Sequence, residues 1–247
     1  MSFTERFSGR AGDYAAARPS YPEGAIDVLF DGLGDAAAVT AADLGAGTGI
    51  SSRQLAARGA LVLAVEPNQS MRDAAEPHTR VEWVAATAEH TGLDEASIDL
   101  AAAFQAFHWF DQPRALKEMV RILRPGGRAA LVYNERDESD PFTAAYGDLV
   151  RKYATDDTER RRAHGIEVFE GFDAWVVQHR REVRNEYALD LDGVLARARS
   201  TSYIPKEGPI ADDLRAEIRA LVARFAHDGR IVMMMRTIVV TADVGSG

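Results

Sequence analysis

Asp43-Leu-Gly-Ala-Gly-Thr-Gly49 is the stretch of this 247-residue chain that decides the fold. The short apolar run 38–43 leads into it, and Ser51-Ser-Arg-Gln-Leu-Ala-Ala57 follows it with helix-forming composition. This order predicts a strand, a glycine turn and a helix. Because glycine accepts positive φ and has no Cβ, three glycines at alternate positions indicate that a ligand approaches the backbone here.

The same unit repeats along the chain, with a fully apolar strand at 60–65 and a helix opening at 68–75. Further strands are predicted at 81–85, 98–104 and 128–133, and an amphipathic helix at 114–123 ends where Arg124-Pro-Gly-Gly127 cannot continue it. An earlier helix covers 25–30, with Ser20 or a neighbour as its cap and Pro22 in its first turn. Such alternation predicts a doubly wound α/β fold, in which helices cover both faces of a mostly parallel sheet.

After Asn134 the pattern changes, because the segment 140–162 is polar, charged and helical in character. We interpret residues 140–178 as a helical lid or substrate-facing insertion. The last two strands are predicted at 182–189 and 229–241, on either side of a helix at 211–225. With residues 1–24 as an N-terminal arm, the whole chain 1–247 is expected to form a single domain.

Composition excludes several classes of function. A net charge of -9 disfavours a phosphate backbone as partner, and the lack of cysteine excludes disulfides, thiolate metal ligands and a cysteine nucleophile. No apolar run approaches the roughly 18 residues of a membrane span, so a cytoplasmic protein without membrane contacts is expected. The histidines are scattered singly, which predicts a site without metal.

The glycine spacing distinguishes between nucleotide ligands. The dinucleotide fingerprint G-x-G-x-x-G requires a third glycine where this chain has Ile50, which speaks against NAD. Asp43 ends the first strand and Glu66 ends the second about 20 residues later, where a carboxylate can accept hydrogen bonds from ribose hydroxyls. Reasoning from the residues alone therefore reaches a nucleoside-binding protein.

Three motifs narrow this prediction. The glycine turn, Glu66-Pro-Asn68 and Leu123-Arg-Pro-Gly-Gly127 together resemble the class I S-adenosylmethionine-dependent methyltransferases. The resemblance implies a seven-stranded sheet of order 3-2-1-4-5-7-6 with the last strand antiparallel, and S-adenosyl-L-methionine as cofactor over the first two strands. The cofactor-binding residues it implies are Tyr14, Arg18, Asp43, Gly45, Ala46, Gly47, Thr48, Glu66, Pro67, Met71, Thr87, Ala88, Glu89, Gln105 and Ala106.

Two segments resemble one group within that family. Phe7-Ser-Gly-Arg-Ala-Gly-Asp-Tyr14 with Arg18-Pro-Ser-Tyr21, and Phe104-Gln-Ala-Phe-His-Trp-Phe-Asp111, are similar to the trans-aconitate methyltransferase-like proteins. In such relatives the N-terminal arm closes over the donor, so Tyr14, Arg18 and Tyr21 are expected near its methionine end. A planar, permanently charged Arg18 would suit a carboxylate.

The resemblance implies methyl transfer to a small molecule, and an oxygen of a carboxylate or hydroxyl is the leading acceptor. A carboxylate needs no base at neutral pH, whereas a hydroxyl must lose a proton, and His108 is placed either to accept it or to orient the substrate. Methylation of carbon or nitrogen, or a catalytically silent nucleoside-binding protein, remain alternatives. The candidate substrate residues are Tyr21, His108, Trp109, Asn134, Arg136, Arg199 and Tyr203. A monomer and a homodimer are both compatible with the sequence.

Overall fold

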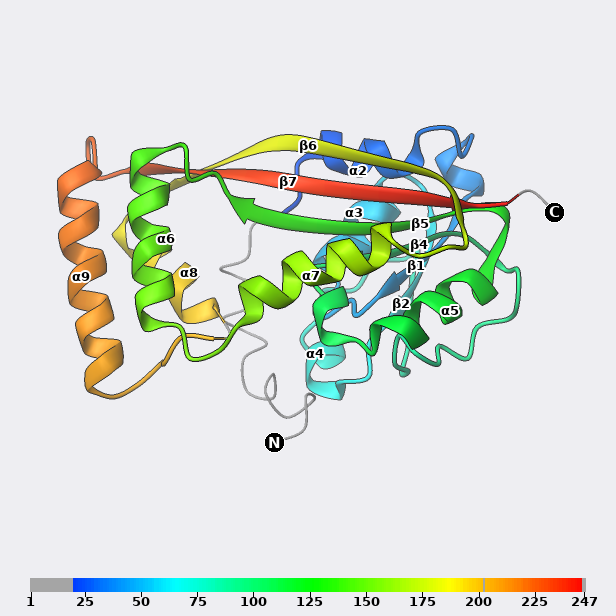
Figure 1. Ribbon diagram of the computed structural model, residues 1–247, viewed down its shortest axis with the longest axis horizontal. Coiled ribbons are helices and arrows are strands. Elements are labelled where there is room, and N and C mark those ends of the chain that lie inside the picture. Colours follow the sequence, from blue (N-terminus) through cyan, green and yellow to red (C-terminus); the bar gives the residue numbers. More distant parts are fainter. Residues whose placement is uncertain (1–19, 202, 246–247) are drawn as a thin grey trace.

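The computed structural model describes residues 20–201 and 203–245. They contain one seven-stranded sheet, whose strand order is β3-β2-β1-β4-β5-β7-β6 (Figure 1). The strands are β1 Thr40–Leu44, β2 Leu61–Val65, β3 Val81–Val84, β4 Ile98–Phe104, β5 Leu123–Arg136, β6 Trp175–Leu189 and β7 Ile231–Val244. Strand β7 runs antiparallel to both β5 and β6, and the first five strands pair in parallel. The predicted order and the single antiparallel strand are confirmed.

Helices cover both faces of this sheet, as the apolar strands require. The helical elements are α2 Glu23–Phe30, η2 Ala36–Ala38, α3 Ile50–Ala57, α4 Gln69–Asp73, η3 Phe107–Trp109, α5 Gln112–Ile122, α6 Pro141–Tyr153, α7 Thr158–Glu170, α8 Leu191–Ser200 and α9 Pro209–Phe225. One hydrophobic cluster joins α2 and α3 to the sheet through Leu29 and Leu55. A second joins α5 and α7 to the opposite face through Leu116 and Phe169.

A long antiparallel pair extends the sheet to one side. Strands β6 and β7 pair from Trp175 as far as Leu189, whereas β5 ends at Arg136 opposite Met235. The outer part of the pair carries α6, α8 and α9, which pack into a third hydrophobic cluster of their own (Figure 1). The molecule therefore has a sheet with two covered faces and, beside it, a helical part built on the extended hairpin.

The structure corrects several predicted boundaries. Strand β5 begins at Leu123, before the predicted start at residue 128, so it includes Arg124-Pro-Gly-Gly127. Pro22 is the N-cap of α2 and lies before its first turn. Strand β6 begins at Trp175, and the expected insertion 140–178 ends earlier, after α6 and α7. Residues 176–182 form an exposed edge strand, and their polar sequence hides its β-character.

Helix α8 was not predicted, although its start carries a sequence signal. The side chain of Asp190 accepts a 2.8 Å hydrogen bond from the backbone N–H of Gly193, which is a typical N-cap. Val194, Leu195 and Ala198 are the apolar residues that α8 buries. They lie three and four positions apart, on one face, so the helix is anchored to the third cluster.

Candidate functional site

The glycine turn follows β1 at the edge of the sheet where parallel strands end. Gly45, Gly47 and Gly49 have φ of +72°, +57° and +73°, in the left-handed region that favours glycine. A Cβ on Gly45 would lie 2.8 Å from the Cβ of Ala106 and 3.0 Å from the ring of Phe110. The turn after β1 and the segment after β4 therefore touch, and only glycine at position 45 permits this approach.

Glu66 ends β2 beside this turn. Its Oε2 accepts a 3.0 Å hydrogen bond from the N–H of Gly47, and its Oε1 accepts one of 2.8 Å from the N–H of Asn68. Burial raises the pKa of Glu66, although the two backbone hydrogen bonds oppose the rise. Each carboxylate oxygen retains a lone pair, so the side chain can still accept hydrogen bonds from ligand hydroxyls.

Asp43 lies under the turn. The side chain is fully buried, and its Oδ2 accepts hydrogen bonds of 2.7 and 2.6 Å from the hydroxyls of Ser51 and Ser52 at the start of α3. Its Oδ1 has no partner among the described residues. Burial raises the pKa of Asp43 to about 6. In this structure Asp43 therefore holds the first turn of α3 against the end of β1.

The remaining residues expected around the donor lie along the same edge. Ala46, Thr48, Met71 and Ala88 are buried, Pro67 is half-buried, and Thr87 is exposed. Glu89 accepts a 2.8 Å hydrogen bond from the N–H of Asp111, the N-cap of α5, so this carboxylate has a structural role at the start of α5. Tyr14 and Arg18 lie outside the described residues.

Gln105 occupies the end of β4 in an uncommon conformation. Its φ is +53°, which is strained for a residue with a side chain, and such strain is frequent at functional sites. The side chain donates a 3.0 Å hydrogen bond to the carbonyl of Asn134 and accepts one of 3.4 Å from Nη1 of Arg162. Gln105 thus connects β4, β5 and α7 at a single point.

His108 follows in η3 and is oriented by Tyr133. The backbone N–H of His108 donates a 3.2 Å hydrogen bond to the Tyr133 hydroxyl, which also lies 3.5 Å from Nδ1 of the ring. Burial raises the pKa of Tyr133, so its hydroxyl stays protonated near neutral pH. The imidazole packs against Trp109 with ring centroids 4.7 Å apart. These contacts hold the ring at the cavity wall.

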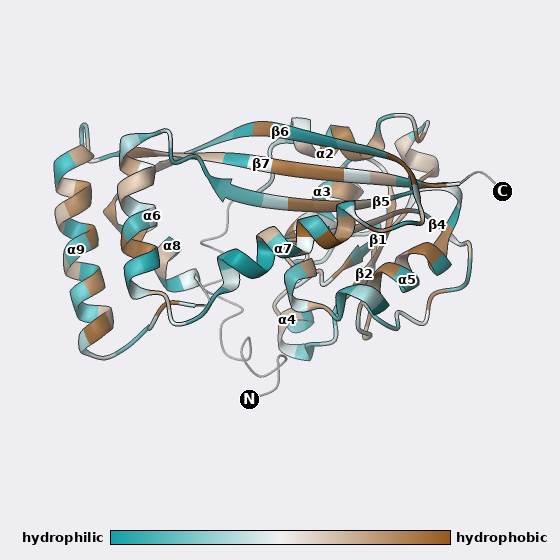
Figure 2. Cartoon of the chain, in the orientation of Figure 1, coloured by the Kyte–Doolittle hydropathy of each residue, from teal (hydrophilic) through white to brown (hydrophobic). Residues whose placement is uncertain are grey.

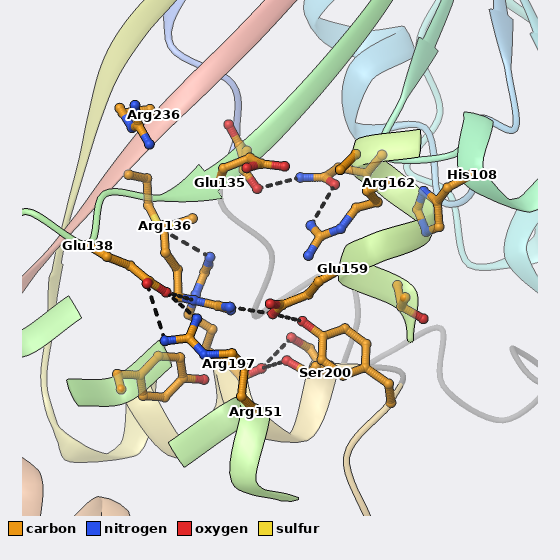
Figure 3. A pocket seen from close by; sticks show the side chains of 18 of the residues that line it. His108, Glu135, Arg136, Glu138, Arg151, Glu159, Arg162, Arg197, Ser200 and Arg236 are labelled. Carbon is orange, nitrogen blue, oxygen red and sulfur yellow. Dashed lines mark hydrogen bonds and ion pairs between the residues drawn. The ribbon is translucent and has the colours of Figure 1, made fainter. Parts of the chain in front are cut away.

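A cavity of about 400 Å³ opens beside Gln105 and His108, between the sheet and the helical part. Of the residues predicted for substrate, Tyr21, His108, Trp109, Asn134, Arg136 and Tyr203 line it. Arg199 does not: it is exposed on α8, and its neighbours Arg197 and Ser200 face the cavity (Figure 3). Position 199 lies on the outer face of the helix because Leu195 and Ala198 turn inward to the third cluster.

Arg136 is held in an ion-pair network. It pairs with Glu159, and it lies 3.4 Å from Glu138. The hydroxyl of Tyr203 donates a 2.9 Å hydrogen bond to the same Glu159 carboxylate. Burial acts to raise the pKa of Glu159, but the hydrogen bonds and charge of Arg136, with the Tyr203 hydroxyl, outweigh it and lower this pKa. The charge of Arg136 is therefore matched within the protein.

The sequence reasoning missed the cavity residues of α7. Thr158, Glu159, Arg162 and Ala163 all line the cavity, and their spacing places them on one helical face. In Figure 2 the first half of α7 is hydrophilic and the second half hydrophobic, which matches a helix that leaves the cavity and enters the core. The run Arg160-Arg-Arg162 within a polar insertion was the available signal.

The chain was compared with protein families, with curated proteins and with solved structures. Residues 42–131 match a family described as a methyltransferase domain. This segment is therefore similar to methyltransferase domains. Within the described residues, no helix has the length and apolar character needed to cross a membrane.

Proteins similar to this chain occur in bacteria and yeast. The chain is 44% identical over 147 residues to an uncharacterized methyltransferase of Mycobacterium tuberculosis, covering 58% of each protein. It is 34% identical over 152 residues to an uncharacterized methyltransferase-like protein of Schizosaccharomyces pombe, covering 61% of this chain and 59% of that one. The alignment thus spans less than two thirds of the curated relatives' length.

A solved structure covers more of the molecule. The fold is similar to that of a candidate type II methyltransferase from Anaeromyxobacter dehalogenans, with a TM-score of 0.68 and 26% identity over 93% of this chain and 99% of that one. The matched segment 42–131 contains the glycine turn, Glu66 and His108, whereas the cavity residues from Asn134 onward lie outside it. These comparisons do not confirm that the chain belongs to the trans-aconitate methyltransferase-like group.

Proposed function

We propose that this chain transfers a methyl group from S-adenosylmethionine to an oxygen atom of a small molecule, either a carboxylate or a hydroxyl. One arrangement carries the proposal: Gln105 and His108 line the cavity, and the segment to which they belong packs against the glycine turn. Gly45 in that turn contacts Ala106, the residue between Gln105 and Phe107 in the chain. A donor held at the turn would therefore face the cavity.

The residues at the turn fit such a donor. Glu66 can accept hydrogen bonds from ribose hydroxyls, and the missing Cβ of Gly45 lets a ligand approach the backbone. The N-terminus of α3 adds backbone N–H groups at the same place. When bound, S-adenosylmethionine supplies an electrophilic methyl group on a sulfonium.

The charges of the cavity favour an acidic acceptor. Among its described lining residues are five arginines and three glutamates, in a protein whose net charge is -9. The arginines are Arg136, Arg151, Arg162, Arg197 and Arg236. Since guanidinium groups bind carboxylates with charge-assisted hydrogen bonds, this wall is better matched to an anion than to a cation.

The role of His108 depends on the acceptor. A carboxylate is already ionised at neutral pH, and His108 would then orient it against the wall formed with Trp109. A hydroxyl has to lose a proton, and the imidazole held by Tyr133 would accept it. The enzyme would otherwise work by positioning the two reactants.

Calorimetric titration with S-adenosylhomocysteine tests the donor site. Tight binding that is lost in Glu66→Ala would support the proposal, and methyl transfer from labelled S-adenosylmethionine to a panel of small acids and alcohols would then identify the acceptor. Absence of binding in calorimetry and in thermal shift would overturn it. Saturation by NAD with no response to S-adenosylhomocysteine would indicate a nicotinamide-binding protein instead.

A further inference from the structure

We infer that Arg162 on α7 binds a carboxylate group of the acceptor and selects acidic substrates. The inference rests on the proposed function, because it names the substrate class for the same cavity. Three features of the described residues support it: the balance of charge in the cavity, the position of Arg162 beside the end of β4, and an unpartnered hydroxyl farther along the wall.

Most of the cavity's arginines are matched by carboxylates. Arg136 pairs with Glu159, and Arg151 pairs with Glu138 at 2.6 Å. Arg236 lies 3.1 Å from Glu182, outside the cavity. These three positive charges are neutralised by carboxylates within the protein. The three arginines therefore stabilise the cavity wall more than they attract an anion.

The other charged residues of the cavity are Arg162, Arg197 and Glu135. Arg197 lies over the ring of Tyr187, with 5.5 Å between the guanidinium carbon and the ring centroid, and it contacts the sulfur of Met235. Arg162 forms no ion pair within the described part of the chain. Its one hydrogen bond there is the 3.4 Å contact with Gln105, and its Nε has no partner. The Nε is buried, so the terminal N–H groups that do not bond Gln105 are the donors left for an anion.

The position of Arg162 connects the cavity to the site of transfer. Gln105 directly follows β4, two residues beyond the buried Ala103, and its side chain accepts the bond from Arg162. Figure 3 places Arg162 on the side of the cavity that holds His108, with Arg151 and Glu138 toward the other side. A carboxylate bound by Arg162 would thus lie close to the end of β4, where the reaction is proposed to occur.

The far wall also suits a polar ligand. Tyr146 on α6 lines the cavity with 2% of its surface exposed, and its hydroxyl has no hydrogen-bond partner among the described residues. An unsatisfied buried hydroxyl costs stability unless a ligand or water pairs with it. We therefore expect an acceptor with a carboxylate at Arg162 and a second polar group that reaches Tyr146.

The test compares acids with their uncharged analogues. Protein saturated with S-adenosylhomocysteine is titrated with a panel of small carboxylic acids and with the primary amide of each acid. We expect acids, but not the amides, to bind the wild type, and Arg162→Gln to weaken acid binding ~10- to 100-fold, the effect of losing a charge-assisted pair. Arg162→Lys should restore part of the affinity because it keeps the charge but not the planar fork.

Arg160→Gln is the matched control, because Arg160 is exposed on the same helix and does not line the cavity. It should bind acids as the wild type does. Unchanged acid binding in Arg162→Gln, equal binding of amides, or binding of no acid by the wild type would each overturn the inference. Titration of the wild type and of each variant with S-adenosylhomocysteine separates the two proposals. Absence of donor binding in the wild type contradicts the proposed function itself. Intact donor binding, with acid binding that does not depend on Arg162, contradicts only the role of Arg162.

Discussion

The backbone N–H of Gly47 lies 3.0 Å from Oε2 of Glu66 and donates a hydrogen bond to it. This contact joins the glycine turn after β1 to the end of β2. The other carboxylate oxygen accepts from the N–H of Asn68, which caps α4. One side chain therefore fixes the shape of two loops and is also the group expected to hold the ribose.

Substitution of Glu66 should reveal both roles. We expect Glu66→Ala to weaken binding of S-adenosylhomocysteine ~100-fold, because charge-assisted hydrogen bonds to the ligand and the support of the turn are lost together. Glu66→Gln retains one acceptor oxygen and should lose less. Calorimetry measures both, and Glu82→Ala on the exposed face of β3 should bind as the wild type does. Equal affinity in all three variants would contradict this role.

Gly45 should tolerate no side chain. Gly45→Ala places a Cβ 2.8 Å from Ala106 at a φ of +72°, so we expect unfolding free energy to fall by ~2–4 kcal/mol, with loss of donor binding. Gly32→Ala separates strain from collision, because Gly32 has a φ of +81° but no atom within 4 Å of the added Cβ. That variant should lose only ~1 kcal/mol. Urea unfolding measures both, and equal losses would rule out the collision with Ala106.

Asp43 makes stability depend on pH in an unusual direction. Burial raises its pKa from 3.8 to about 6, so between those values the folded chain binds more protons than the unfolded chain. The unfolding free energy therefore falls as pH rises through this window, by ~3 kcal/mol in total. Asp43→Asn cannot titrate. Urea unfolding from pH 4 to 7 should show the wild type losing stability relative to the variant, and a constant difference would show that Asp43 keeps an ordinary pKa.

Glu159 should matter more for stability than an exposed glutamate of the same helix. Glu159→Gln leaves the half-buried Arg136 with only the 3.4 Å contact to Glu138, so we expect a loss of ~1–3 kcal/mol in unfolding free energy. Glu167→Gln is the control, because Glu167 is exposed and has a single 3.7 Å contact with His164. It should change stability by less than ~0.5 kcal/mol. Similar losses in thermal or urea unfolding would mean that the network contributes nothing measurable.

His108 should distinguish the two oxygen acceptors. For a hydroxyl acceptor, His108→Gln should lower kcat by ~10²–10⁴-fold, because a general base is lost. For a carboxylate acceptor the fall should stay below ~10-fold, since no proton is removed. Steady-state kinetics with the identified acceptor measures the effect, and His179→Gln on the exposed strand β6 serves as control. Unchanged kcat with a hydroxyl acceptor would exclude His108 as the base.

The sequence sufficed for the parallel half of the molecule. There, apolar strands alternate with helices, and parallel strands place Gly45, Glu66 and Gln105 at one edge by topology alone. The structure brings His108 and Tyr203 to the same cavity, although 95 positions of sequence separate them. Residues were predicted for the site because they follow strand ends. They line the cavity because β5 and the end of α8 both contribute to its wall.

The helical part could not be predicted in the same way. Residues 176–182 of β6 are exposed on an edge strand and carry no apolar alternation, and α8 is short. Arg162 lies in a polar stretch whose partners, Gln105 after β4 and Arg136 on β5, are far away in sequence. Only the packing of α7 across the sheet gives this arginine a different environment from Arg160.

The extended pairing of β6 with β7 has a consequence for how specificity can be altered. Tyr146 and Tyr203 on the cavity wall belong to the third hydrophobic cluster, while α7 and the residues that flank the glycine turn belong to the two clusters of the sheet. Substitutions in separate cores tend to be additive. If the proposed function holds, α6 and α8 form a separate module, and substitutions there would alter acceptor binding while donor binding at the glycine turn stays intact.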